Sequence, residues 1–178
     1  MALTKWALDP THSEVTFKIK HLMIANVSGE FTKFAVDAET EGEDFTKAKV
    51  NFTADVTSIT TGNEQRDGHL KTDDFFNAEK YPQIKFTATK YEAVDNDGSY
   101  ELYGELTIRD VTKPVKLDVE FGGVVKDPWG NTRAGFSVNG KISRKEFGLK
   151  WTATTEAGGI VVGDDVRIHC DIQLVKEA

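Results

Sequence analysis

Few side chains in this sequence have both the type and the spacing that chemistry requires. The four histidines, His12, His21, His69 and His169, lack the spacing of metal ligands, so the sequence predicts no metal site. Because histidine titrates near neutral pH, His21 and His69 are the two candidates for acid–base catalysis. The sequence contains no hydrolase nucleophile motif, no phosphate-binding loop and no dinucleotide-binding fingerprint. These observations predict a protein that is not an enzyme and needs no cofactor.

Residues 63–76 form the one stretch that is compatible with a helix, and they combine polar and apolar groups. Arg66 and His69 supply a cation and a titratable ring, whereas Leu70 and two phenylalanines supply apolar surface. One interpretation is an amphipathic helix that closes one end of the fold. The other is a lid that offers Arg66 and His69 to the polar head of a ligand.

Three more positions need an interpretation. His21 is in phase with three apolar residues, so it is expected to point inward, as a buried histidine or as a polar group at a cavity mouth. Residues 144–151 contain an aromatic cluster that predicts a plug at one rim, and alternatively Arg144 pairs with a phosphate or a carboxylate. Cys170 is the single cysteine, so it forms no internal disulfide and is expected to be a small buried apolar residue.

The elements that must position these residues are strands. Apolar and polar residues alternate with a period of two, which is typical of strands with one dry and one wet face. The alternating segments are 15–21, 48–58, 84–89, 100–109, 115–121, 134–142 and 166–174, and a weaker strand over 29–38 brings the number to about eight. Turn signals at 96–98 and 127–131 predict hairpin connections.

Eight long antiparallel strands in one domain, 1–178, indicate an all-β fold, either a sandwich or a barrel. A barrel of eight strands has room for side chains or for one small ligand, and alternation alone does not separate these two cases. The apolar residues that we predict to face the lumen are Val15, Phe17, Ile19, Phe31, Phe52, Val56, Leu70, Phe75, Phe76, Phe86, Leu106, Ile108, Leu117, Phe136, Ile142, Phe147, Leu149 and Trp151.

The charge of the chain narrows the class of partner. The net charge of -7 argues against nucleic acid, whose phosphates require Lys and Arg contacts. No apolar run approaches the about 20 residues of a membrane span. Residues 1–6 carry no signal-peptide core, so the chain as given is expected to be cytoplasmic, or periplasmic if a leader was trimmed.

A series of motifs along the whole chain resembles the YceI-like (polyisoprenoid-binding) family. In chain order, the motifs that carry the resemblance are Trp6-x-Leu8-Asp9-Pro10-x-His12-Ser13-x-Val15-x-Phe17-x-Ile19-x-His21, Gly29-x-Phe31, Ser58-Ile59-x-Thr61-Gly62, Arg66-Asp67-x-His69-Leu70, Asp74-Phe75-Phe76, Tyr81-Pro82-x-Ile84-x-Phe86, Gly104-x-Leu106-Thr107-Ile108-Arg109-Asp110-Val111-Thr112-Lys113-Pro114-Val115, Arg144-x-x-Phe147-Gly148-Leu149-x-Trp151 and Val162-Gly163-Asp164-x-Val166.

The resemblance implies an eight-stranded, lipocalin-like antiparallel barrel with an apolar lumen. It also implies a ligand class, because relatives hold polyisoprenoid chains, isoprenoid quinones or fatty amides, and a homodimer, because relatives commonly form dimers. We therefore expect non-catalytic binding, storage or transport of a long-chain amphiphilic lipid. His21, Arg66, His69 and Arg144 are the candidates for contact with its head group.

Two other functions remain open at this point. One is a lipid-modifying enzyme that uses His21 and His69, although no obvious nucleophile accompanies them. The other is a stress-related structural protein with a filled barrel and no ligand. A haem-binding variant rests on the inward phase of His21 alone.

Overall fold

Strands form most of the molecule in the computed structural model, which describes residues 3–21, 24–42, 44–73, 75–93, 98–149 and 162–177. The strands are β1 (Leu3–Leu8), β2 (Glu14–His21), β3 (Ala25–Phe31), β4 (Phe34–Glu41), β5 (Asp44–Asp55), β6 (Ile59–Thr60), β7 (Gln83–Ala93), β8 (Ser99–Ile108), β9 (Val111–Lys126), β10 (Thr132–Ser143) and β11 (Val162–Lys176). The helices are η1 (Pro10–His12), η2 (Val56–Ser58), α1 (Glu64–Leu70) and η3 (Arg144–Phe147).

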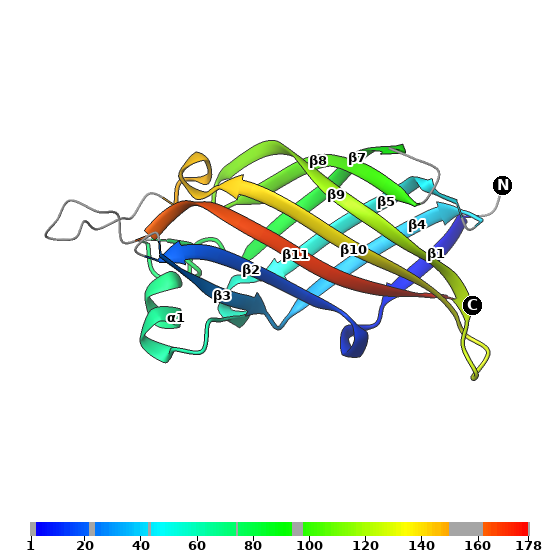
Figure 1. The fold of residues 1–178 in the computed structure, drawn as a ribbon, viewed down its shortest axis with the longest axis horizontal. Coiled ribbons are helices and arrows are strands. Elements are labelled where there is room, and N and C mark those ends of the chain that lie inside the picture. Colours follow the sequence, from blue (N-terminus) through cyan, green and yellow to red (C-terminus); the bar gives the residue numbers. More distant parts are fainter. Residues whose placement is uncertain are drawn as a thin grey trace, which may run out of the picture.

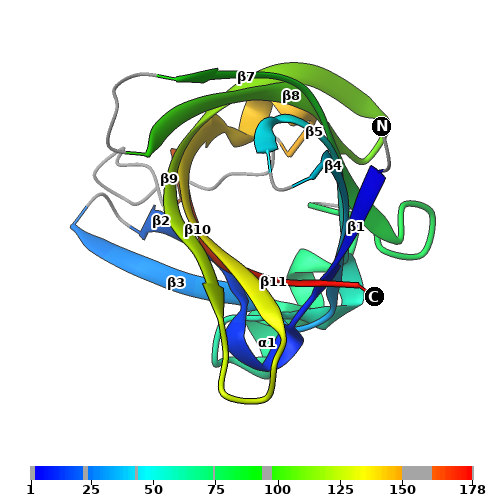
Figure 2. The ribbon, with the colours of Figure 1, turned by 90° about the vertical axis from the view of Figure 1, so that its right-hand side faces the viewer.

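The strands close into an antiparallel barrel. Its sheet order is β1-β4-β5-β7-β8-β9-β10-β11, and β1 pairs with β11 to complete the ring. The closing pairs join Trp6 to Lys176 and Leu8 to Leu174. Figure 2 shows the strands arranged as a ring in a view close to the barrel axis. The predicted eight-stranded antiparallel barrel is therefore confirmed, and the predicted helical insertion is present as α1.

Three segments of the chain are each divided into two strands. β1 continues into β2, β3 into β4, and β5 into β6. β2 follows β1 and pairs with β11, β3 pairs with β2, and β6 pairs with β3. The break after β1 contains Pro10, which has no N–H for a ladder, and the Asp9 carboxylate caps the η1 turn at Thr11 N. The strands predicted over 29–38 and 48–58 are thus interrupted at 32–33 and end at Asp55.

The two ends of the barrel differ in what lies there. α1 and η3 lie at one end, called here the helical end, and both chain termini lie at the opposite, terminal end (Figure 1). An aromatic cluster fills the terminal end, where Phe45 lies 4.9 Å from both Trp6 and Phe136, between ring centroids. The Phe121 ring stacks on Phe136 at 5.1 Å. The interior is therefore packed shut at the terminal end.

Candidate ligand-binding cavity

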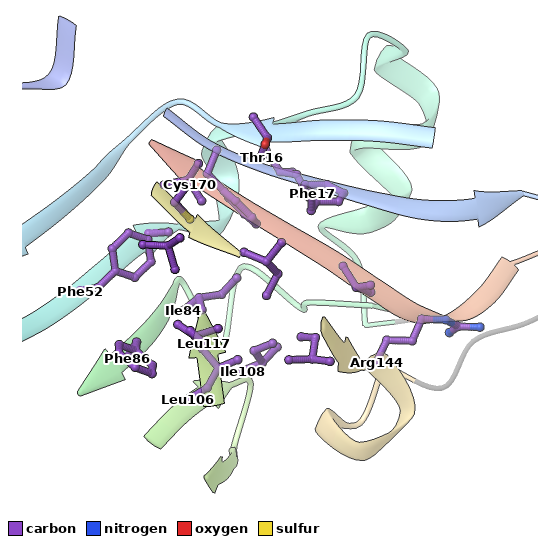
Figure 3. Close-up of a pocket in the computed structure, with 18 of the residues that line it drawn as sticks. Thr16, Phe17, Phe52, Ile84, Phe86, Leu106, Ile108, Leu117, Arg144 and Cys170 are labelled. Atoms are coloured by element: carbon purple, nitrogen blue, oxygen red, sulfur yellow. The ribbon is translucent and has the colours of Figure 1, made fainter. Parts of the chain in front are cut away.

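The barrel encloses a cavity of about 630 Å³ whose wall is mainly apolar (Figure 3). Phe17, Leu117 and Ile168 are only half-buried although they line this cavity, because open space lies against part of each side chain. The predicted lumen residues that line the cavity are Val15, Phe17, Ile19, Phe31, Phe52, Leu70, Phe75, Phe76, Phe86, Leu106, Ile108, Leu117, Phe136, Ile142 and Leu149. The interior is thus hollow, a point that alternation leaves open.

Three predicted lumen residues lie elsewhere. Val56 and Phe147 are each 1% exposed and belong to the hydrophobic core, but they are not among the residues that line the cavity. Both are in short 3-10 turns, where the period of two no longer determines which way a side chain points. Trp151 lies outside the described residues.

Polar side chains line the cavity at the helical end, around α1. Arg66 is exposed there, and its guanidinium is fixed because Nε donates to Thr61 Oγ1 at 2.7 Å and Nη2 donates to the Thr61 carbonyl at 2.8 Å. The Thr61 hydroxyl in turn donates to Asp67 Oδ1 at 2.5 Å. Asn63 caps the helix by accepting a bond from the Arg66 backbone N–H at 3.0 Å. This network holds a cation at the mouth of the cavity.

His69 reaches the same mouth from the last turn of α1. Its ring packs edge-on against Phe75, with 5.1 Å between the ring centroids, and both residues line the cavity. Of the predicted head-group residues, the structure thus brings Arg66 and His69 to one end of the cavity. The backbone of His21 ends β2 and pairs with Ala25, but its side chain lies outside the described part of the chain.

Arg144 borders the cavity but is directed at the backbone in the bonds that the structure shows. It is 2% exposed, and its guanidinium donates from Nε to the Gly163 carbonyl at 2.7 Å and from Nη1 to the Leu149 carbonyl at 2.6 Å. Burial lowers the pKa of the Arg144 guanidinium, and the nearby Asp164 charge acts in the opposite direction. Arg144 therefore fastens the η3 turn to β11 (Figure 3). Its contact with a ligand head stays a prediction.

A residue outside the predicted set, Arg109, holds the loop after α1. It occupies a left-handed conformation, with φ of 55°, in the hairpin between β8 and β9. Its Nη2 donates to Asp73 Oδ1 at 2.7 Å, and its Nη1 donates to the Phe75 carbonyl at 3.1 Å. Phe75 and Phe76 line the cavity, so Arg109 positions two of its aromatic residues. Arg109 lies in the motif stretch of residues 104–115, but no spacing rule in the sequence links Arg109 to the loop after α1.

Cys170 lines the cavity from β11. Burial raises the pKa of its thiol to about 12, and the neighbouring Asp171 carboxylate adds to this increase. The thiol therefore stays protonated at neutral pH and is a poor nucleophile.

Within the described ranges, no group of three or more His, Cys, Asp or Glu side chains is arranged to hold a metal ion. In the same part of the chain, no helix has the length and apolar character to span a membrane.

Comparison with known proteins assigns the chain to a group. A family model described as the YceI-like domain matches residues 6–174. A UPF0312 protein of Staphylococcus epidermidis (strain RP62A) is 38% identical over 172 residues, which cover 96% of this chain and 97% of the relative. A UPF0312 protein of Staphylococcus aureus (strain USA300) is 36% identical over the same shares of the two chains.

Solved structures share the fold. The Campylobacter jejuni YCEI protein is 37% identical, with a TM-score of 0.75 over 90% of this chain and 91% of that one. BcnA of Burkholderia cenocepacia has a TM-score of 0.80 at 22% identity, over 93% of this chain and 98% of that one. A structure described as a polyisoprenoid binding domain from Saccharophagus degradans has a TM-score of 0.71 at 17% identity, over 97% of this chain and 98% of that one.

Proposed function

This chain belongs to the YceI-like family, and we propose that it holds the tail of a long-chain amphiphilic lipid inside its barrel. The observation that carries this proposal is the cavity of about 630 Å³, with its mainly apolar wall and its polar groups gathered at one end. A concave apolar space of this kind suits a hydrocarbon chain and offers little to a polar solute.

The positions of the polar groups determine how we orient the ligand in the cavity. The aromatic cluster of Trp6, Phe45, Phe121 and Phe136 fills the terminal end, whereas Arg66 and other polar side chains line the helical end. We place the tail toward the terminal end and the head near Arg66 and His69. A head that accepts hydrogen bonds suits this position, because the Arg66 guanidinium is a donor only.

The energetics favour exchange with a membrane over permanent capture. A tail gains about 0.8 kcal/mol for each CH₂ group that leaves water, but its usual location is a bilayer, where it is already dry. The cavity therefore competes with another apolar medium, and transfer in either direction has a small free-energy difference. This balance suits a protein that stores or transports a lipid.

The family and one structural neighbour guide the choice of ligand class. The Saccharophagus degradans domain is described as binding polyisoprenoids, which makes these the first ligands to test, followed by isoprenoid quinones and fatty amides. The proposal is binding without turnover. The sequence-based expectations of a homodimer and of a cytoplasmic location stay predictions, which light scattering and cell fractionation would test.

The experiment combines extraction with a matched pair of variants. The purified protein is extracted with organic solvent, the extract is analysed by mass spectrometry, and the stripped protein is titrated with geranylgeraniol. Ile168→Trp fills the cavity from β11, whereas Arg167→Trp adds the same ring to the exposed face of the adjacent residue. We expect wild type and Arg167→Trp to bind and Ile168→Trp to lose binding. An empty extract together with no binding by wild type contradicts the proposal.

A further inference from the structure

Strands β9 and β10 separate at the helical end of the barrel. Their pairing runs from Thr132 with Lys126 to Asn139 with Asp118, and the structure gives no pair between these two described strands beyond that point. β9 continues for residues 111–117 paired with β8, and β10 continues through Ser143 paired with β11. The barrel wall therefore has a gap between 111–117 and 140–143, where no backbone ladder joins its two sides.

Pro114 gives a reason for the gap. The hairpin loop of residues 109–110 makes Ile108 and Val111 the first hydrogen-bonded pair, and bonded and non-bonded pairs alternate along an antiparallel ladder. Pro114, which pairs with Glu105, is then in a non-bonded pair, so its backbone faces β10. Proline has no N–H to donate on that side. The sequence itself therefore weakens the β9–β10 ladder at this position.

Phe147 lies beside the gap, because it lines the same surface cleft as Pro114 of β9 and Ile142 of β10. Phe147 belongs to η3, is 1% exposed, and lies among the core residues. The turn that presents it is fixed by Gly148, whose φ of 83° is a conformation that favours glycine, and by a bond from Leu149 N to the Arg144 carbonyl at 3.0 Å. A buried aromatic ring on a short turn therefore stands beside the part of the wall that lacks a β9–β10 ladder.

Phe147 lines a surface cleft of about 340 Å³. Two of its lining residues, Val115 and Ile142, also line the cavity, so the cleft and the cavity are separated by a single layer of side chains. The other residues that line the cleft are Lys113, Pro114, Lys116, Lys141, Ser143, Glu146 and Phe147.

Lysines outnumber carboxylates in the lining of the cleft, although the whole chain carries a net charge of -7. Three lysines and one glutamate line the cleft. Lys116 pairs with Glu101 at 2.8 Å and Lys141 lies 3.8 Å from Asp165, between nitrogen and oxygen. Lys113 is half-buried, and no described carboxylate forms an ion pair with it. An anion in the cleft would supply the partner that Lys113 lacks.

We propose that this gap is a portal through which the lipid tail enters and leaves the cavity, and that the cleft binds the phosphate of a phosphorylated amphiphile during uptake. The proposal rests on the proposed function, because it needs a tail that occupies the cavity. The phosphate contacts Lys113 at the surface while the tail passes Phe147 into the barrel. A neutral lipid uses the same portal without the benefit of the cleft.

The test measures rates with two probes of equal tail length, geranylgeranyl phosphate and geranylgeraniol, by stopped-flow displacement of an apolar dye. Lys113→Gln is expected to slow association of the phosphate about tenfold, as the loss of one charge-assisted contact implies, and to leave the alcohol unchanged. Lys49→Gln, on the exposed face of β5, is the matched control. Inorganic phosphate at high concentration slows association of geranylgeranyl phosphate only, which separates the phosphate contact from the tail.

Phe147→Ala tests the portal itself. It is expected to raise the dissociation rates of both probes several-fold, and Phe147→Leu is expected to do so less. Val56→Ala is the control, because Val56 is equally buried but lines neither the cavity nor the cleft. A thermal melt of each variant verifies that the fold is retained.

The outcomes separate the two proposals. If wild type binds geranylgeraniol but Phe147→Ala exchanges it at the wild-type rate, the portal is wrong and the proposed function stands. If Lys113→Gln slows the alcohol as much as the phosphate, the cleft does not recognise phosphate. If wild type binds neither probe, both proposals fail.

Discussion

The two ends of this barrel differ in how completely their side chains are packed. At the terminal end, aromatic rings pack against one another, and the buried Trp6 Nε1 donates to Thr40 Oγ1 at 2.8 Å. At the helical end, a seven-residue helix and a loop held by Arg109 border a cavity whose mouth carries Arg66. The terminal end is the more tightly packed of the two: its indole N–H is bonded, and Phe45 and Phe136 of its aromatic cluster form the floor of the cavity. The helical end leaves apolar side chains half-covered.

This difference indicates a division between the two ends: the terminal end stabilises the fold, and the helical end binds the ligand. Packing that is complete stabilises the fold but leaves no room for a ligand. Packing that is incomplete leaves stabilising contacts unmade, and a bound tail can supply them. We therefore expect substitutions at the terminal end to change mainly the free energy of unfolding, and substitutions at the helical end to change mainly the affinity for lipid.

The largest effect is expected for Trp6→Ala. Trp6 is 3% exposed and does not line the cavity, so its truncation leaves a void in the aromatic cluster. We expect the free energy of unfolding to fall by about 3–5 kcal/mol, measured by urea titration. Trp6→Phe, which keeps the ring packing but loses the bond to Thr40, should cost about 1–2 kcal/mol. A loss of lipid affinity in Trp6→Phe without a loss of stability would contradict the division.

The second-largest effect is expected for Leu70→Ala, which should weaken lipid binding more than it lowers stability. Leu70 is half-buried at the end of α1 and lines the cavity. We expect binding of geranylgeraniol to weaken by about 1–2 kcal/mol, because two or more carbons of contact are lost, while stability of the stripped protein changes less. Titration and a urea midpoint on the same preparation make the comparison. A larger loss in stability than in binding would show that the helical end is an ordinary core.

A third effect concerns charge at the terminal end. Arg133 contacts the carboxylates of Asp9 and Asp127, and His12 Nδ1 lies 2.8 Å from Asp9 Oδ2. Hydrogen bonds from His12, Thr11 and Arg133, in decreasing order of effect, hold the pKa of Asp9 well below its ordinary value. A carboxyl with a lowered folded pKa stabilises the fold above the unfolded pKa of about 3.9, and this contribution is lost as the pH falls below it.

Asp9→Asn removes that titration. We expect the urea midpoint of wild type to fall between pH 5 and pH 3 more steeply than that of the variant, with the two curves converging at low pH. Asp73→Asn is the control at the helical end, because the Asp73 side chain is 79% exposed in its pair with Arg109. Parallel curves for wild type and Asp9→Asn would refute this assignment.

The smallest effect leaves stability unchanged and reports on the cavity. With its pKa raised to about 12, the Cys170 thiol should react with a water-soluble maleimide far more slowly than in the unfolded chain. Geranylgeraniol should slow the reaction further, because Cys170 lines the cavity. Labelling at pH 8 followed by mass spectrometry measures both rates. Rapid labelling that lipid does not alter would place the thiol outside the ligand site.

Strand positions could be predicted from the sequence because each inward side chain repeats a local rule. The segment predicted at 84–89 lies in β7, and that predicted at 134–142 lies in β10. The rule fails where the backbone leaves the strand, as at Val56 and Phe147, whose side chains point into the core from 3-10 turns. Alternation also says nothing about the distance to the opposite wall, so the hollow interior followed from the family resemblance alone.

The contacts at each end of the barrel could not be predicted from the sequence, because they join residues that are distant along the chain. Phe45 lies in an acidic stretch without alternation, yet the register of β5 places its ring between Trp6 and Phe136. Arg109 is 36 residues from Asp73, and only the closed barrel brings the two together. Motif positions identified Arg66 and His69 as candidates, but their common location depends on the three-dimensional course of α1.

The closure of the ring by its first and last strands has a consequence for how the chain reaches its native state. β11 pairs with β10, β2 and β1, so residues 162–176 supply three of the ladders of the barrel. During synthesis these residues follow those of β1, β2 and β10, and until they emerge from the ribosome the edges of those three strands lack their partner. We expect folding to be late, dominated by contacts distant in sequence, and slow. Exposed strand edges during that interval are sites of aggregation. By pairing with these edges, β11 also protects the chain from aggregation.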